Sequence, residues 1–159
     1  MNQHKVIRPV SAGYDEDLYA WSRDQADRLR ALRPAQFDWE NVAEEIESLG
    51  KSDRRSVQSD LKIVLLHLIK WKYQPQKRKS GWRSSINEHR DRIERIIEDS
   101  PSLAGVPASS LRAEYRKARK QALEDTKLPA SDVPETCPFS VEQVLDADYW
   151  PNAERSGRR

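Results

Sequence analysis

Residues 61–71, LKIVLLHLIKW, are the stretch of this sequence that decides the fold. On a helical wheel with 3.6 residues per turn, the apolar side chains of this stretch cover most of the circumference, which is typical of a helix enclosed by other helices. Only Lys62, His67 and Lys70 interrupt the apolar run. The sequence therefore predicts a central helix around which the rest of the chain packs.

The composition indicates one helical domain. The chain of 159 residues is 36% hydrophobic and 34% charged with only 5 glycines, which fits soluble amphipathic helices better than a β-sandwich or a disordered chain. Cys137 is the one cysteine, so an intramolecular disulfide is excluded and a reducing cytoplasm is expected. No stretch predicts a secretion signal or a membrane span. We expect a flexible arm over residues 1–13, one helical domain over residues 14–150 and a flexible tail over residues 151–159.

Apolar periodicity and capping signals predict an all-α bundle of five to six helices, four of them bundled around the central one. Two start signals stand out: Asp38 as an N-cap with a staple of Phe37 and Val42, and a capping box of Ser140 and Gln143. Gly50 occupies a position typical of a C-cap. The expected helices are residues 15–33, residues 39–49, a long helix from Ser52 to just before Pro75, residues 82–99, a helix from Ser109 or Ser110 to Leu128, and residues 141–147.

Charge is distributed unevenly along the chain. The net charge is +2, but residues 14–49 hold ten acidic and four basic residues, whereas residues 62–95 hold ten basic and three acidic ones. The simpler interpretation is that the two halves pack together and partly neutralise each other. The alternative is a dedicated site for a polyanion.

Cations and aromatic residues alternate where the central helix ends and turns into the next one. Such a combination can hold a phosphate backbone and stack bases. Alternatively, the aromatic rings face inward and close the helical hairpin, while the cations stay solvated or pair with the acidic helix over residues 39–49. This basic turn comprises Lys70, Trp71, Lys72, Tyr73, Lys77, Arg78, Lys79, Trp82 and Arg83.

His67 is the most conspicuous polar residue of the central helix. It is either a general base or ligand, or a histidine at the edge of the core that bonds a carboxylate. Glu45 is the carboxylate that we expect to be partly buried, and we propose it as the partner. A metal site of Glu44, Glu45, Glu47, His67 and His89 is disfavoured because neither histidine has an acidic residue three positions before it. No metal and no cofactor is therefore predicted.

Several blocks of the sequence resemble a bacterial family known as domain of unknown function number 29. The blocks are YDEDLYAW at residues 14–21, DWENVAEEIE at 38–47, HLIKWKYQP at 67–75, WR at 82–83, EDSPSL at 98–103 and CPF at 137–139. They occur in the family's order, so the resemblance covers about residues 14–150. It implies a compact all-helical domain with no established activity, substrate or cofactor, and it supplies no catalytic residues.

Three functions are compatible with these patterns. The first is a non-enzymatic, cytoplasmic interaction module that binds a partner protein through its charged surfaces. The alternative is a nucleic-acid-associated protein that uses the basic turn around residues 70–83, and the third is an enzyme built on Glu45 and His67. Homo-oligomers stay open as well, because the central helix offers many apolar residues for other helices to cover.

Overall fold

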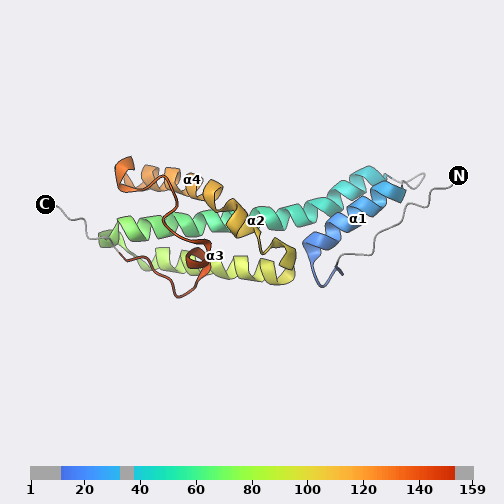
Figure 1. Ribbon diagram of the computed structural model, residues 1–159, viewed down its shortest axis with the longest axis horizontal. Coiled ribbons are helices and arrows are strands. Elements are labelled where there is room, and N and C mark those ends of the chain that lie inside the picture. Colours follow the sequence, from blue (N-terminus) through green and yellow to red (C-terminus); the bar gives the residue numbers. More distant parts are fainter. Residues whose placement is uncertain (1–11, 33–37, 153–159) are drawn as a thin grey trace. The chain divides into compact units, whose positions relative to one another are not determined.

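The computed structural model describes residues 12–32 and 38–152, and all regular structure in them is helical (Figure 1). The prediction of an all-α fold is therefore confirmed. Residues 1–11 of the N-terminal arm, Phe37 of the proposed staple and residues 153–159 of the tail lie outside the described residues. No described helix is long and apolar enough to cross a membrane. The helices are α1 (Leu18–Leu32), α2 (Trp39–Tyr73), α3 (Ser80–Asp99), α4 (Val106–Thr126) and α5 (Val141–Leu145), with short 3-10 turns at Pro75–Lys77, Pro101–Leu103 and Ala130–Asp132.

The chain forms two compact units. Unit 1 comprises Met1–Arg55 with Ile96–Ala104, and unit 2 comprises Ser56–Arg95 with Gly105–Arg159. Helices α2 and α3 contribute residues to both units. The single domain expected over residues 14–150 stays a prediction.

Helix α2 corrects one prediction. The sequence predicts two helices separated by Gly50, but the helix continues through this residue to Tyr73. None of the described glycines has the positive φ of a left-handed C-cap. Gly50 is instead buried against Tyr19 and Ser22 of α1. The glycine allows two helices to approach closely and does not end one of them.

Unit 1 is held together where α1 begins. Asp17 is buried and caps α1, because its Oδ1 accepts a hydrogen bond of 2.7 Å from Ala20 N. Its carboxylate also accepts bonds from Ser102 N at 2.6 Å and Ser102 Oγ at 2.9 Å. The buried Ser100 accepts a bond of 3.3 Å from Tyr19 N. The start of α1 is thus fixed to the turn that follows α3.

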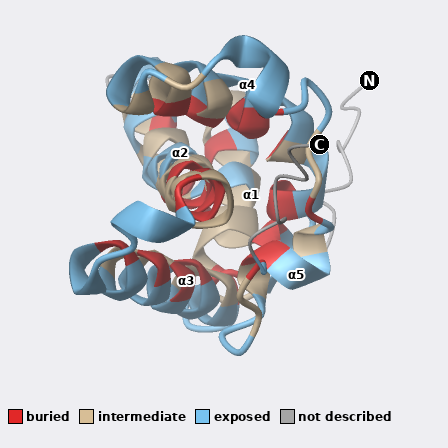
Figure 2. Ribbon diagram, turned by 90° about the vertical axis from the view of Figure 1, so that its left-hand side faces the viewer, coloured by how far each residue is buried: buried red, intermediate tan, exposed pale blue. Residues whose placement is uncertain are grey.

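In unit 2, α2 lies between α3 and α4 (Figures 1 and 2). The central apolar stretch is confirmed as core. The sequence predicts that the fourth described helix begins at Ser109 or Ser110, but α4 begins at Val106. Pro107 fits the first turn because the backbone N–H groups there have no partner within the helix. The core residues that α2 contributes here are Val57, Leu61, Val64, Leu65, Leu66, Leu68 and Ile69.

The C-terminal segment packs on α3 in unit 2. The predicted capping box is confirmed, with Ser140 Oγ accepting from Gln143 N and Gln143 Oε1 accepting from Ser140 N. Arg90 is 4% exposed and donates to the carbonyl oxygens of Val144 at 2.8 Å and of Gln143 and Tyr149 at 3.2 Å. This one side chain anchors both α5 and the segment after it.

Candidate binding site

Arg78 of the basic turn has a structural role. Its Nε donates to the Trp71 carbonyl at 2.9 Å, and its Nη2 donates to the Pro151 carbonyl at 3.4 Å. The guanidinium lies 4.9 Å from the centre of the Trp71 ring, which in turn lies 4.9 Å from the Trp150 ring. Arg78 therefore joins the end of α2 to the C-terminal segment.

Other cations of the basic turn also contact groups of the protein. Lys79 lies 5.7 Å from the ring of the buried Trp82, and Arg83 lies 5.1 Å from the Trp150 ring. A nucleobase that stacked on these rings would have to displace the two cations. Lys70 forms an ion pair of 2.6 Å with Asp125 of α4, Lys72 lies 5.5 Å from the half-buried Tyr73 ring, and Lys77 is exposed.

The predicted pair of Glu45 and His67 does not form. Both residues lie on the continuous helix α2, 22 positions apart, and side chains of one helix meet when they are three or four positions apart. Glu45 is exposed, so its expected partial burial is also wrong. The reason is the continuity of α2, because the prediction placed the two residues on different helices. An enzyme built on this pair has no support in the described residues.

His67 is half-buried and its Nδ1 has no hydrogen-bond partner among the described residues. Burial, reinforced by the positive charge of Lys70 and by His89, lowers the pKa of His67 to about 4. The ring is consequently neutral at pH 7. A neutral ring does not attract an anionic ligand.

A different carboxylate and histidine do meet in unit 2. His89 Nδ1 of α3 lies 2.6 Å from Asp60 Oδ1 of α2, and Arg92 lies 4.0 Å from the same oxygen. Asp60 was not predicted as a site residue, although its place between the core residues Val57 and Leu61 indicates a buried carboxylate. No group of three potential metal ligands occurs among the described residues. The pair joins α2 and α3.

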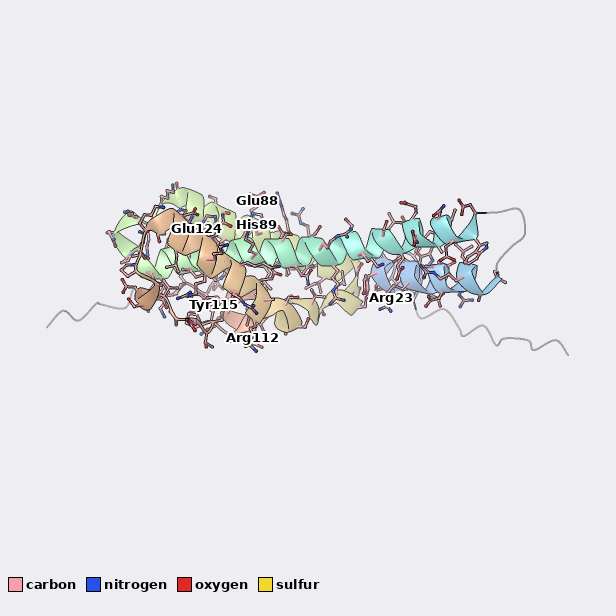
Figure 3. All side chains as sticks on the ribbon, turned by 90° about the horizontal axis from the view of Figure 1, so that it is seen from above. Arg23, Glu88, His89, Arg112, Tyr115 and Glu124 are labelled. Carbon is pink, nitrogen blue, oxygen red and sulfur yellow. The ribbon has the colours of Figure 1, made fainter. Side chains whose placement is uncertain are left out.

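An open cleft of about 850 Å³ lies between α4 and the loop over residues 135–139. Arg112 and Arg116 are exposed and stand one helical turn apart on α4, and Figure 3 shows Arg112 and Tyr115 along this helix. Leu111 and the buried Phe139 supply apolar surface. The cleft is lined by Leu111, Arg112, Tyr115, Arg116, Arg119, Glu135, Thr136, Cys137 and Phe139.

Two side chains of α4 hold the loop that forms the second wall of the cleft. Tyr115 donates its hydroxyl to the Pro134 carbonyl at 2.6 Å. Arg119 donates to the carbonyls of Val133 at 3.0 Å and Ala130 at 2.8 Å. Burial raises the pKa of Tyr115, so its hydroxyl stays a donor at neutral pH. The cleft is therefore pre-formed.

Cys137 is the one thiol that lines the cleft. The Cys137 thiol lies 3.3 Å from the Phe139 carbonyl, and burial raises the pKa of this thiol. A neutral thiol is a poor nucleophile. The cleft was not predicted, although arginines at positions 112, 116 and 119 share one face of a helix. That spacing was the only available signal, because the opposite wall comes from a distant loop.

Comparison with known proteins places the chain in a family. A family model described as domain of unknown function DUF29 matches residues 14–150. The chain belongs to the DUF29 family. Two blocks that carry the earlier resemblance, residues 14–21 and 98–103, meet in unit 1 through Asp17 and Ser102. In this DUF29 protein those blocks thus have a structural explanation.

A similar fold is known from a crystal structure. An alpha-helical protein of unknown function from Rhodospirillum rubrum matches with a TM-score of 0.72 and 25% sequence identity, over 87% of this chain and 92% of that one. Comparison with curated proteins gives no match. The comparisons therefore support the fold and the DUF29 family, and neither names an activity.

Proposed function

We propose that this DUF29 protein is a non-enzymatic interaction module that binds an acidic segment of a partner protein in the cleft between α4 and residues 135–139. The observation that carries the proposal is the exposed pair Arg112 and Arg116 beside the apolar surface of Leu111 and Phe139. Guanidinium groups bind carboxylates through two parallel hydrogen bonds. We place the interaction in the cytoplasm, which suits a chain whose one cysteine is a free thiol.

The dimensions and charge of the cleft favour a short peptide segment as the occupant. Its volume of about 850 Å³ lies within the usual range of ligand sites, roughly 300 to 1,000 Å³. Three guanidinium groups face one carboxylate, that of Glu135, so the lining has a positive charge. An occupant with acidic side chains and one large apolar side chain satisfies both kinds of surface.

Selection from a random peptide display library against the intact protein tests this proposal. We expect enrichment of peptides that combine Asp or Glu with Leu, Phe or Trp, and loss of their binding in the variant Arg112→Glu with Arg116→Glu. The control carries Arg95→Glu with Lys120→Glu, which changes the net charge equally at exposed positions outside the cleft. Selection without acidic enrichment, or equal binding by the two double variants, contradicts the proposal.

Nucleic-acid binding through the basic turn is the second candidate. The exposure of Lys77, Lys79 and Arg83 favours it. Titration of mixed-sequence single-stranded DNA and RNA at low salt tests this candidate, with Lys77→Ala, Lys79→Ala and Arg83→Ala combined as the variant. Absence of binding, or unchanged binding by the variant, eliminates it.

A further inference from the structure

Two guanidinium groups of the cleft have no partner within the described part of the chain. Arg112 and Arg116 are exposed and line the cleft, and neither forms a hydrogen bond or an ion pair with any residue that the structure describes. Lys117 of the same helix differs, because its ammonium group binds the buried Glu114 carboxylate at 2.7 Å. Arg112 and Arg116 therefore keep their hydrogen-bond donors for a ligand.

The spacing of the two arginines suits one shared anionic group. Residues four positions apart on a helix are neighbours, with Cβ atoms about 5 to 6 Å apart, and both side chains line the same cleft. A carboxylate has two oxygens in one plane and pairs both of them with a single guanidinium group. A phosphoryl group has three terminal acceptor oxygens in a tetrahedral arrangement. It can consequently bind the guanidinium groups of Arg112 and Arg116 at the same time.

The charge of the cleft matches one phosphate ester. The lining holds three guanidinium groups and the single carboxylate of Glu135, which leaves two positive charges. A phosphorylated side chain carries about −1.5 to −2 charges at pH 7, whereas one carboxylate carries a single charge. One phosphoryl group thus neutralises the lining where one carboxylate neutralises half of it.

The loop wall of the cleft supplies a neutral donor. Thr136 is exposed and lines the cleft, and its hydroxyl has no hydrogen-bond partner within residues 12–32 and 38–152. Tyr115 and Arg119 fix the loop just before this residue. Threonine hydroxyls, like arginine side chains, are common ligands of phosphate oxygens.

We infer that the acidic group bound in this cleft is a phosphoryl group, carried by a phosphorylated side chain of the partner segment. The inference rests on the proposed function, because it names the anion that the proposed site binds. Arg112 and Arg116 hold the phosphoryl oxygens from α4, and Thr136 donates to them from the loop. An apolar side chain of the same segment packs on Leu111 and Phe139, which supply the apolar surface of the cleft.

Three pools of peptides test the inference with the intact, immobilised protein. The pools have random, non-acidic flanking positions and differ only at the centre, which is phosphoserine with alanine, a pair of aspartates, or serine with alanine. We expect at least fivefold more retention of the phosphoserine pool than of the aspartate pool, although their charges are similar, and least retention of the serine pool. Equal retention of the phosphoserine and aspartate pools overturns the inference and leaves the proposed function standing. Equal retention of all three pools overturns both.

A charge-conserving variant tests the two guanidinium groups. Arg112→Lys with Arg116→Lys keeps both positive charges but removes the paired hydrogen bonds. We expect the preference for phosphoserine over the aspartate pair to fall below twofold. The control, Arg95→Lys with Lys120→Arg at exposed positions outside the cleft, should keep the full preference. Circular dichroism verifies that both variants are folded, and an unchanged preference in Arg112→Lys with Arg116→Lys overturns the inference.

Competition distinguishes a phosphorylated segment from a small phosphate compound. Phenyl phosphate supplies a phosphoryl group and an aromatic ring without a peptide. We expect it to displace a fluorescent phosphoserine pool only at concentrations at least tenfold higher than those of the unlabelled pool, because the flanking residues also contact the cleft. Displacement at equal concentrations assigns the cleft to a small phosphate compound and overturns the inference.

Discussion

Gly50 of α2 lies so close to Ser22 of α1 that a Cβ on the glycine would be 2.5 Å from the serine Oγ. The same Cβ would be 2.8 Å from Tyr19 Cδ2 and 3.1 Å from Tyr19 Cα. Because one of these atoms belongs to the backbone, side-chain rotation alone does not relieve the contact. The close approach of α1 and α2 therefore depends on glycine at this position.

Gly50→Ala is the first test of this packing. Alanine favours a helix interior over glycine by about 1 kcal/mol, but overpacking costs about 1 to 3 kcal/mol. We expect the steric effect to dominate and the free energy of unfolding to fall. Urea denaturation followed by circular dichroism measures the change.

Gly81→Ala is the matched control for Gly50→Ala. Gly81 also lies within a helix, α3, but a Cβ there meets no atom within 4 Å. We expect this variant to be neutral or to gain up to about 1 kcal/mol. Equal responses of the two glycines would show that helix propensity, and not the contact with α1, decides the outcome at Gly50.

Asp17→Ala should destabilise unit 1 because it removes three hydrogen bonds at once. The carboxylate caps α1 and accepts two bonds from Ser102. Loss of the cap and of the two bonds from Ser102 lowers the free energy of unfolding by about 2 to 4 kcal/mol. Thermal unfolding measures the loss, with the exposed Asp15→Ala as a control that should change stability by less than about 0.5 kcal/mol. Equal effects of the two substitutions would contradict the role assigned to Asp17.

The sequence predicts the helices that carry local signals. The capping box of Ser140 and Gln143 and the apolar periodicity of α3 depend on neighbours in the chain, and both are confirmed. The continuity of α2 is not predictable in this way. The requirement for Gly50 arises from α1, which packs against it from another part of the sequence. A glycine that permits helix packing and one that ends a helix look alike in a single sequence.

The candidate site shows the same difference between features that depend on neighbours in the chain and features that depend on distant segments. The cations of the basic turn are visible in the sequence, but their contacts with Trp150 and Asp125 come from distant segments. The error over Glu45 and His67 follows directly from the missed continuity of α2. The cleft on α4 combines a helix face with a loop that follows it, and apolar periodicity alone does not reveal such a surface.

Arg90→Lys should release the C-terminal segment from α3. Arg90 donates to three carbonyl groups after Ser140, and lysine has a single ammonium group that cannot reproduce this arrangement. We expect the free energy of unfolding to fall by at least about 2 kcal/mol. We also expect faster amide hydrogen exchange over residues 140–152. Arg92→Lys, an exposed neighbour, is the control. Unchanged exchange in Arg90→Lys would show that other contacts hold the segment.

Lys127→Gly should stabilise the end of α4. Lys127 is the one described residue other than glycine with a positive φ, 58°, and it occupies the C-cap. Glycine adopts this conformation without the steric cost of a Cβ, which predicts a gain of about 0.5 to 1 kcal/mol. Lys120→Gly, in the interior of the same helix, should lower the free energy of unfolding by about 1 kcal/mol. Thermal unfolding of both variants shows whether stability rises in Lys127→Gly and falls in Lys120→Gly. Lower stability in both variants would contradict the assignment of Lys127 as the C-cap.

His67 should make the protein less stable as the pH falls from about 6.5 to about 4. Its pKa is about 4 in the folded chain and near 6.5 in the unfolded chain, so within this window the unfolded state binds a proton that the folded state does not. Stability therefore rises with pH through the window and falls with acidification. After allowance for the partial exposure of the ring, the effect is about 1 to 2 kcal/mol. His67→Leu lacks this proton, so its stability relative to wild type should be constant above pH 7 and increase as the pH falls. Urea denaturation of both proteins at several pH values measures the difference, and a difference independent of pH would show that His67 titrates normally in the folded chain.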